Sequence, residues 1–351
     1  MNFINTSLAV SSACALFFSS NQVSAETGTE TKADWSKVRL YGHAYSNKGF
    51  TKEEYQFVAD KMPLFTIEKR HAQNVHGPAS TEKATLVTAR KIKKLNPDTK
   101  ILFYWNCDLI YAPLYETLKD LAETQPTWVR ESRFKRVTAA KNGYNFGEQG
   151  AQDFWVKTAA DIVADPSIGG VFVDASSKAA VNGQLEIVHK LMDELPGLVL
   201  YNGYRVKPQD KTFFGGAETL KHADGVFVEA FLSGPIKTAE AAEVLIEGLL
   251  KIPADKHIIC NGLIDAFGSN GSHEFSLAAY LIVANENTYY RFGKGHNFNN
   301  EYMTFWHDDF AKEIGEPSGK ATKEGLTYKR SFEHVDVTLD LENQKATLNW
   351  K

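Results

Sequence analysis

The chain has 351 residues, of which 43% are hydrophobic and 23% are charged, and its formal net charge is −4. This composition is ordinary for a globular protein and leaves room for one large α/β barrel or two smaller domains. No basic run with interleaved aromatic residues occurs, which excludes the usual nucleic-acid-binding surface, so we expect no nucleic-acid partner.

Residues 1–25 are predicted to be a signal peptide. They contain no charged side chain, and an apolar segment at residues 8–18 is followed by a small-x-small pattern before Glu26. Cleavage after Ala25 predicts a secreted or periplasmic protein. The apolar segment is too short to cross a bilayer, and no later segment approaches the roughly 20 apolar residues that a membrane span needs. Residues 26–36 are polar and are expected to form a flexible lead-in.

Strand patterns then alternate with helix patterns along the chain. The predicted strands are residues 38–44, 64–71, 100–108, 170–175, 197–204, 225–230, 257–262 and 287–292. Helices are predicted from a capping box at residue 51, and at residues 80–95, 114–123, 151–164, 184–195, 216–222, 238–250 and 273–285. Ser80 is the expected cap of the second helix. A polar loop over residues 125–150 interrupts the series, and loops of that length are usually functional or mobile.

Eight strands in alternation with helices predict a (β/α)₈ TIM barrel rather than an open doubly wound sheet. We assign the catalytic barrel to residues 37–324. Residues 325–351 contain alternating strand patterns at 328–332, 335–341 and 346–350, the last two joined by a hairpin turn. This segment is too small to be a domain and is predicted to be a short β extension packed on the barrel.

Two cysteines remain after the predicted leader, which itself contains Cys14. Cys107 and Cys260 fall at the ends of the third and seventh predicted strands, on opposite sides of the barrel. A disulfide needs Cα atoms closer than about 7 Å. The sequence therefore predicts two free, buried thiols.

Two near-identical stretches carry the strongest functional signal. Residues 170–175 read GVFVDA and residues 225–230 read GVFVEA, so each predicted strand ends in a carboxylate, Asp174 or Glu229. Strands four and six lie two apart in a barrel, which places their backbones about 9–10 Å apart, and inward side chains of alternate strands share a layer. The carboxyl groups then fall in the range that glycosidases use, about 5 Å for retention or about 6.5–9.5 Å for inversion.

The spacing does not decide between these two outcomes. A competing interpretation is a polar barrel mouth in which both acids simply pair with Lys69, Arg70 or Arg291. We favour the catalytic interpretation, because two carboxylates that end buried strands without an obvious partner are costly unless they serve a function.

Polar and aromatic side chains end the other predicted strands, as expected for the active face of a barrel. The candidate substrate-binding residues are His43, Glu68, Arg70, His71, Trp105, Asn106, Asp108, Tyr201, Asn202, Asn261 and Arg291. Trp105 suits stacking on a sugar face or plain packing. The three Asn suit hydroxyl recognition or turns. Arg70 and His71 suit an anionic substituent such as a uronate or sulfate, or they neutralise nearby acids.

No cofactor or metal is expected. The histidines are scattered, and the sequence contains no H-x-x-x-H or C-x-x-C pattern, no P-loop and no G-x-S-x-G elbow. A dinucleotide fingerprint between a predicted strand and a predicted helix is also missing from the sequence.

Several stretches resemble a family of uncharacterised, glycosyl-hydrolase-like barrel proteins, over nearly the whole mature chain. They are residues 89–97, 101–106, 170–175, 201–203, 224–231 and 332–350. The resemblance implies a (β/α)₈ fold related to α-glycosidases, with an Asp after strand four as nucleophile and an acid after strand six as proton donor. These correspond to Asp174 and Glu229. Residues 144–147 read Tyr-Asn-Phe-Gly where the family has an acidic Tyr-Asp-Leu-Ser type of sequence, which puts shared specificity in doubt.

The sequence thus predicts an exported glycoside hydrolase that cleaves a glycosidic bond in an oligo- or polysaccharide. Glu229 would protonate the leaving oxygen, while Asp174 would attack the anomeric carbon or hold a water. One alternative is a polysaccharide lyase on a uronate sugar, with Tyr201 or His71 as base. Another is a non-catalytic glycan-binding barrel, which salt bridges on both acids would favour.

Overall fold

The computed structural model describes residues 34–132, 141–207, 212–293, 295–296, 298 and 306–351. The predicted signal peptide, Cys14 and most of the predicted lead-in lie outside the described residues, as does part of the predicted loop over residues 125–150. No helix in these described ranges has the length and apolar character needed to cross a membrane.

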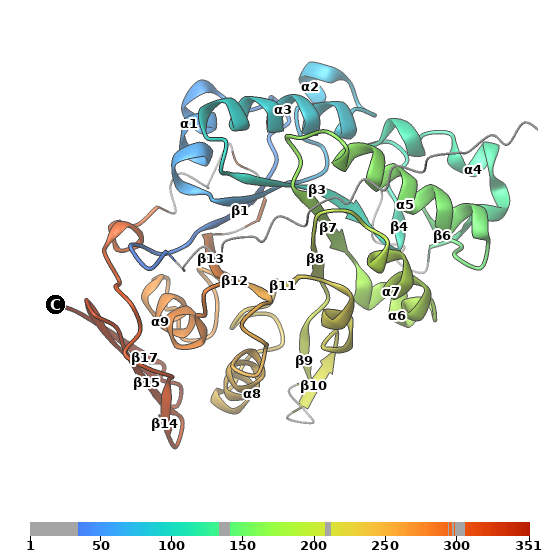
Figure 1. The fold of residues 1–351 in the computed structure, drawn as a ribbon. Helices are drawn as coiled ribbons and strands as arrows, with labels where there is room; N and C mark the ends of the chain where they lie inside the picture. Colours follow the sequence, from blue (N-terminus) through green and yellow to red (C-terminus); the bar gives the residue numbers. More distant parts are fainter. Residues whose placement is uncertain (1–33, 133–140, 208–211, 294, 297, 299–305) are drawn as a thin grey trace, which may run out of the picture. The chain divides into compact units, whose positions relative to one another are not determined.

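In the described part of the chain, eight parallel strands form a nearly closed barrel with helices around it (Figure 1). In spatial order they are β1 (Tyr41–Ala44), β2 (Leu64–Ile67), β3 (Lys100–Asn106), β7 (Gly170–Asp174), β8 (Leu198–Asn202), β11 (Gly225–Val228), β12 (His257–Leu263) and β13 (Thr288–Gly293). Leu40 forms a parallel bridge with Tyr290, which brings the first and last strands together. The predicted (β/α)₈ barrel is confirmed.

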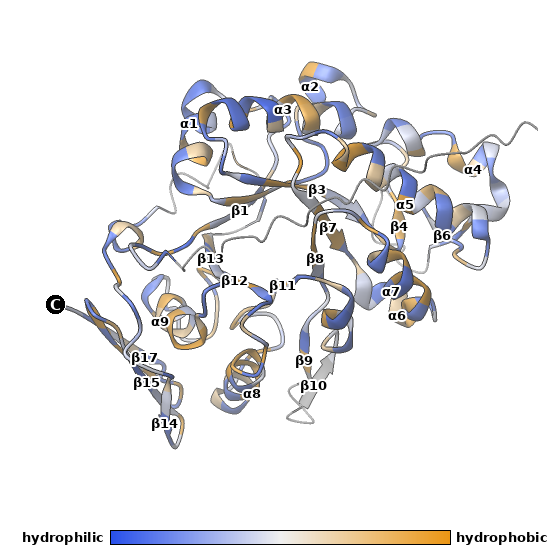
Figure 2. Ribbon diagram, in the orientation of Figure 1, coloured by the Kyte–Doolittle hydropathy of each residue, from blue (hydrophilic) through white to orange (hydrophobic). Residues whose placement is uncertain are grey.

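The helices follow the strands with the expected rhythm. They are α1 (Lys52–Lys61), α2 (Gln73–His76), α3 (Thr81–Leu95), α5 (Gln149–Val163), α6 (Ser176–Val181), α7 (Leu185–Asp193), α8 (Ala239–Leu249) and α9 (Glu274–Val283). The predicted capping box is present, because the Glu54 N–H donates to Thr51 Oγ1 and the Thr51 N–H donates to the Glu54 carboxylate. Hydrophilic and hydrophobic residues are mixed along α1 and α8, as on helices with one buried face (Figure 2).

One predicted helix cap and one predicted helix in the first half of the chain were wrong. Ser80 precedes α3 but does not cap it, since its hydroxyl donates to the Gly77 carbonyl instead. The helix expected at residues 114–123 is only a 3₁₀ turn, Glu116–Leu118, followed by the four-residue α4, Leu121–Thr124. The Glu82 carboxylate accepts the N–H groups of residues 116 and 117, so a tertiary contact holds this segment as a turn.

The polar loop after β3 contains strands that the sequence did not reveal. β4 (Leu109–Ile110), β5 (Val129–Glu131) and β6 (Asn142–Tyr144) form a small antiparallel sheet with β6 in the centre. β9 (Arg205–Lys207) and β10 (Thr212–Gly215) form an antiparallel pair after β8. The helix expected at residues 216–222 is a 3₁₀ turn, Glu218–His222.

The C-terminal segment forms a four-stranded antiparallel sheet that packs on α9. Its strands are β14 (Thr322–Glu324), β15 (Thr327–Ser331), β16 (Val335–Asp340) and β17 (Lys345–Trp350). Val335, Val337 and Leu339 alternate with more exposed residues along β16 and supply the buried face. As predicted, this segment packs on the barrel and its last two strands form a hairpin. Strand β14 was not predicted.

Candidate active site

A pocket of about 240 Å³ opens where several barrel strands end at their C-terminal sides. It is lined by His43, Glu68, Lys69, Tyr104, Phe172, Asp174, Ala175, Ser177, Lys178, Asn202, Arg205, Phe227, Glu229 and His296. Five of the thirteen predicted site residues are in this set: both candidate catalytic acids, His43, Glu68 and Asn202.

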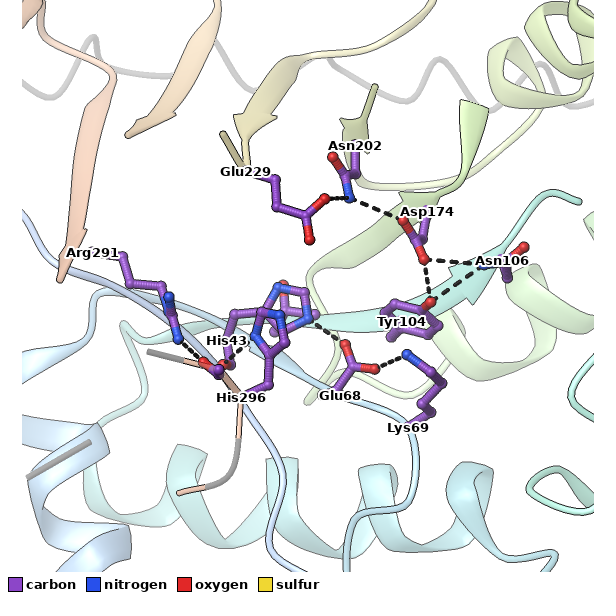
Figure 3. A network of polar contacts seen from close by, with 12 residues as sticks. His43, Glu68, Lys69, Tyr104, Asn106, Asp174, Asn202, Glu229, Arg291 and His296 are labelled. Carbon is purple, nitrogen blue, oxygen red and sulfur yellow. Dashed lines mark hydrogen bonds and ion pairs between the residues drawn. The ribbon is translucent and has the colours of Figure 1, made fainter. Parts of the chain in front are cut away.

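Asp174 and Glu229 face each other across the side chain of Asn202 (Figure 3). Asp174 ends β7, Glu229 directly follows β11, and Asn202 ends β8, the strand between them. The Asn202 Nδ2 donates to Asp174 Oδ1 at 3.0 Å and to Glu229 Oε2 at 3.0 Å. Because both hydrogen bonds start from one nitrogen, Asp174 Oδ1 and Glu229 Oε2 lie no more than about 6 Å apart. Neither acid forms an ion pair with a residue that the structure describes.

Two further donors hold Asp174 from the β3 side. Tyr104 and Asn106 lie on the same face of β3, and the Tyr104 hydroxyl and the Asn106 Nδ2 both donate to Asp174 Oδ2, the latter at 3.1 Å. Burial, followed by the charge of Asp174, raises the pKa of Tyr104 well above its usual value. The hydroxyl therefore keeps its proton and remains a donor to the carboxylate.

A buried charged group forms the opposite wall of the pocket. Glu68 Oε2 lies 2.5 Å from His43 Nε2, and Glu68 Oε1 pairs with Lys69 Nζ. Burial alone would raise the pKa of Glu68, but Lys69 and His43 lower it far below its usual value. Burial alone would lower the pKa of Lys69, but Glu68 raises it overall. Glu68 and Lys69 are therefore both charged, as in a well-partnered buried ion pair.

His296 packs against His43, with ring centroids 4.5 Å apart. Burial, His43 and Arg291 lower the pKa of His296 to about 3, so its ring is neutral at physiological pH. This residue lies beyond the last barrel strand, and no pattern in the sequence singled it out.

The two aromatic residues predicted to bind substrate, Trp105 and Tyr201, lie outside the pocket. Trp105 points to α5, where its Nε1 donates to the Trp155 carbonyl at 3.1 Å. The Tyr201 hydroxyl donates to the Gly216 carbonyl. Both residues are neighbours of inward-facing asparagines, and side chains alternate across a strand. Their positions explain why they pack behind the barrel wall.

Three polar residues that follow β2 and β3 and were predicted to bind substrate also lie outside the pocket. His71 is buried against α3, where its Nε2 lies 2.9 Å from Thr88 Oγ1. Arg70 is exposed, with a left-handed φ of 72°, and does not line the pocket. Asp108 is buried and pairs with Arg130 in the small sheet.

The remaining predicted residues support the site from behind. The Asn261 Nδ2 donates to the Glu229 carbonyl at 2.9 Å, and Asn261 Oδ1 accepts from Arg291 Nη1. Both side chains are buried. Asn106 contacts Asp174 as described above. Asn106 and Asn261 each contact one of the acid residues, Arg291 contacts Asn261, and none of the three lines the pocket.

The candidate list did not include six polar or charged residues that line the pocket. They are Lys69, which was considered only as an ion-pair partner of the acids, Tyr104, Ser177, Lys178, Arg205 and His296. Tyr104 was accessible to reasoning, because the alternation that directs Asn106 inward directs Tyr104 inward as well. Lys178 and Arg205 belong to α6 and β9, two short elements that were not predicted.

Among the described residues, no group of three or more His, Cys, Asp or Glu side chains is arranged to hold a metal ion. The candidate site is therefore a pair of carboxylates with hydrogen-bond donors and cations around them.

The chain matches one sequence-family model and is similar in fold to several solved structures. The family model described as hypothetical glycosyl hydrolase family 15 matches residues 93–336. No curated protein matches the sequence. A noncanonic maltogenic alpha-amylase from Thermotoga neapolitana has a similar structure, with a TM-score of 0.50 and 9% identity over 86% of this chain and 85% of that one. An alpha-amylase from Geobacillus thermoleovorans has a TM-score of 0.50 and 11% identity over 87% and 86%. At such identities these likenesses bear on the fold alone.

Proposed function

Because the chain belongs to hypothetical glycosyl hydrolase family 15, we propose that it is an exported glycoside hydrolase with Asp174 and Glu229 as its catalytic carboxylates. The observation that carries this proposal is the pair of carboxylates at the pocket, bridged by one amide and free of ion pairs among the described residues. The non-catalytic alternative would have been favoured by salt bridges on both acids.

The separation of the two acids favours retention of configuration. The bridged oxygens, Asp174 Oδ1 and Glu229 Oε2, lie no more than about 6 Å apart, which is compatible with the roughly 5–5.5 Å between the carboxyl groups of retaining enzymes. Asp174 attacks the anomeric carbon while Glu229 gives its proton to the leaving glycosidic oxygen. Glu229 then takes a proton from water, and the water oxygen displaces Asp174 from the sugar.

The surroundings of each acid support this division of roles. Asp174 accepts from Tyr104, Asn106 and Asn202, which suits an ionised carboxylate that only accepts hydrogen bonds. Glu229 is exposed and accepts from Asn202 alone among the described side chains. Its second oxygen is therefore open to a leaving group.

The pocket also supports an anionic substrate. Lys178 and Arg205 line it alongside the two proposed catalytic acids, in addition to Lys69, which pairs with Glu68. Arg70 and His71, the residues first considered for this role, lie elsewhere. We therefore propose that the substrate is an oligo- or polysaccharide with an anionic substituent such as a uronate or sulfate.

Product analysis tests the reaction class. The protein is incubated with neutral and anionic polysaccharides, and the fragments are analysed by mass and by proton NMR. Hydrolysis adds one water per cleavage, and retention first produces the anomer of the starting linkage. An unsaturated product that absorbs in the ultraviolet, without added water, would show elimination and overturn the proposal.

Variants test the two acids. Asp174→Asn and Glu229→Gln are each expected to lower kcat roughly a thousandfold while leaving the melting temperature close to that of the wild type. Asp224→Asn is the control, because Asp224 precedes the same strand as Glu229 at its opposite end. Unchanged turnover in both active-site variants would contradict the assignment.

Export predicts a mature protein that begins at Glu26, which N-terminal sequencing of the secreted chain checks.

A further inference from the structure

Asn202 occupies the one strand end that adjoins both acid-bearing strands. β8 pairs with β7 on one side and with β11 on the other, and Phe227 of β11 is directly opposite Asn202 in the register. A side chain at this position that faces inward therefore lies between Asp174 and Glu229. No other barrel strand of the described sheet is adjacent to both.

The amide of Asn202 is suited to two carboxylates at once. Its nitrogen carries two hydrogens, and one nitrogen donates at 3.0 Å to Asp174 and at 3.0 Å to Glu229. The reverse orientation would place the amide oxygen against two acceptors, so the neighbouring charges fix the direction of the side chain. Two carboxylates at this separation repel each other, and the shared donors offset that repulsion.

We propose that Asn202 is a positioning residue that holds Asp174 and Glu229 at their working separation and determines which oxygen of each takes part in the reaction. The inference rests on the proposed function of the same site. It assigns Asn202 a role toward the acids rather than toward a sugar hydroxyl.

The contacts select one oxygen on each acid. Glu229 Oε2 accepts from Asn202, so Oε1 holds the acid proton, and this second oxygen points away from Asn202 (Figure 3). Asp174 Oδ2 accepts from both Tyr104 and Asn106, whereas Oδ1 accepts from Asn202 alone among the described side chains. Oδ1 therefore keeps a lone pair for the anomeric carbon.

The backbone around the bridge is itself anchored. The Ser176 hydroxyl donates to the Asn202 carbonyl at 2.9 Å, and the Asn261 amide donates to the Glu229 carbonyl at 2.9 Å. These contacts hold the backbones of Asn202 and Glu229 in place and do not involve the carboxyl oxygens. Removal of the Asn202 amide therefore isolates its effect on the two acids.

The experiment compares Asn202→Leu with Asn106→Leu in the full chain. Both variants replace an amide with an apolar side chain of similar size, but Asn106 donates to Asp174 and to the Tyr104 hydroxyl and not to Glu229. Asn202→Leu is expected to lower kcat about a hundredfold with little change in KM, and to move both limbs of the pH–rate profile to higher pH. Asn106→Leu is expected to move the acid limb alone. Lys69, Lys178 and Arg205 are unchanged in both variants, so their influence is common to the two profiles.

Crystal structures of the same variants test the bridge independently of activity. In Asn202→Leu the two acids are expected to separate beyond about 6 Å, and in Asn106→Leu they are expected to stay in place. Asn202→Asp is a second, isosteric variant, in which a third carboxylate must drive the acids apart. Wild-type spacing in both Asn202 variants, or a pH–rate profile of Asn202→Leu that matches the wild type, would overturn the inference. If the wild type cleaves no glycan, the proposed function fails, and the spacing alone decides the role of Asn202.

Discussion

His71 shows how a polar residue just past a strand end becomes part of the core. The Ser46 N–H donates to its Nδ1 at 3.1 Å, so the ring proton lies on Nε2 and is donated to Thr88 Oγ1 at 2.9 Å. Burial, with the charges of His76 and Lys91, lowers the pKa of His71 from 6.5 to about 3. The ring is therefore neutral and fully hydrogen-bonded in the folded protein.

This depressed pKa predicts a loss of stability in acid. Below about pH 6.5 the unfolded chain binds a proton at His71, whereas the folded protein does so only near pH 3. The free energy of unfolding therefore falls as the pH decreases through this window, and the contribution is fully present above it. Between about pH 7 and about pH 4.5, the melting temperature of His71→Gln is expected to fall less than that of the wild type, as measured by calorimetry.

His334 provides the control for this prediction, because its side chain is 43% exposed. His334→Gln is expected to follow the acid dependence of the wild type. An equal loss of melting temperature in His71→Gln and the wild type would contradict the prediction.

The residues of the candidate site differ in how far the sequence revealed them. Asp174 and Glu229 were visible because each interrupts an apolar run at the end of a buried strand. Asn202 was recognised as a candidate, but its bridge between the acids was not, since that contact depends on three separate strands. Trp105 and Tyr201 were assigned to the wrong face of their strands, an error that strict alternation from Asn106 and Asn202 would have avoided.

At the scale of elements, α9 depends on the C-terminal sheet. Every residue of α9 beyond its first, Glu274, is buried, and β15, β16 and β17 pack on it. Arg330 of β15 donates from Nη1 to the carbonyls of Leu281, Ile282 and Ala284 at the end of α9. These carbonyls have no partner within the helix, so Arg330 serves as its C-terminal cap.

Removal of this cap is predicted to destabilise the protein. Arg330→Ala leaves the last carbonyls of α9 without a donor and is expected to lower the free energy of unfolding by about 2–3 kcal/mol, as measured by urea denaturation. Lys329→Ala is the matched control at the next, exposed position, with an expected change within about 0.5 kcal/mol. A similar small change in both variants would show that the contact contributes little.

The barrel strands were more predictable than the short pairs outside the barrel. The barrel strands, including the four-residue β1, β2 and β11, stand out as mainly apolar runs that end in polar residues, and their predicted positions were confirmed to within a few residues. The small sheet after β3 and the pair β9–β10 contain only two to four residues per strand. Their strand character arises from pairing between distant segments, such as Leu109 with Gly143, rather than from local pattern.

The number and reactivity of the cysteine thiols test both the fold of the chain and its proposed export. Cys107 and Cys260 are buried and not bonded to each other, as predicted. Burial raises the pKa of both thiols, which leaves them protonated and unreactive in the folded protein. Cys14 lies in the predicted signal peptide, so it is retained only if that segment is not cleaved.

A thiol titration without reductant is expected to find no reactive group in the folded protein and two groups after unfolding. Two groups correspond to an exported chain that has lost its leader. Three groups in the secreted protein would contradict the proposed cleavage after Ala25, and fewer than two would show that a thiol is bonded.

The barrel could be predicted from the sequence alone, because the apolar character and order of its strands are local properties of the chain. The two strand-end carboxylates were visible for the same reason, since an acid that ends a buried strand is a local feature too. Their surroundings depend on long-range packing. The bridge through Asn202, the Tyr104 hydroxyl on Asp174 and the entry of Lys178 and Arg205 into the pocket all depend on strand register and on short connecting elements. Contacts across a barrel join residues far apart in sequence, and no local pattern encodes them.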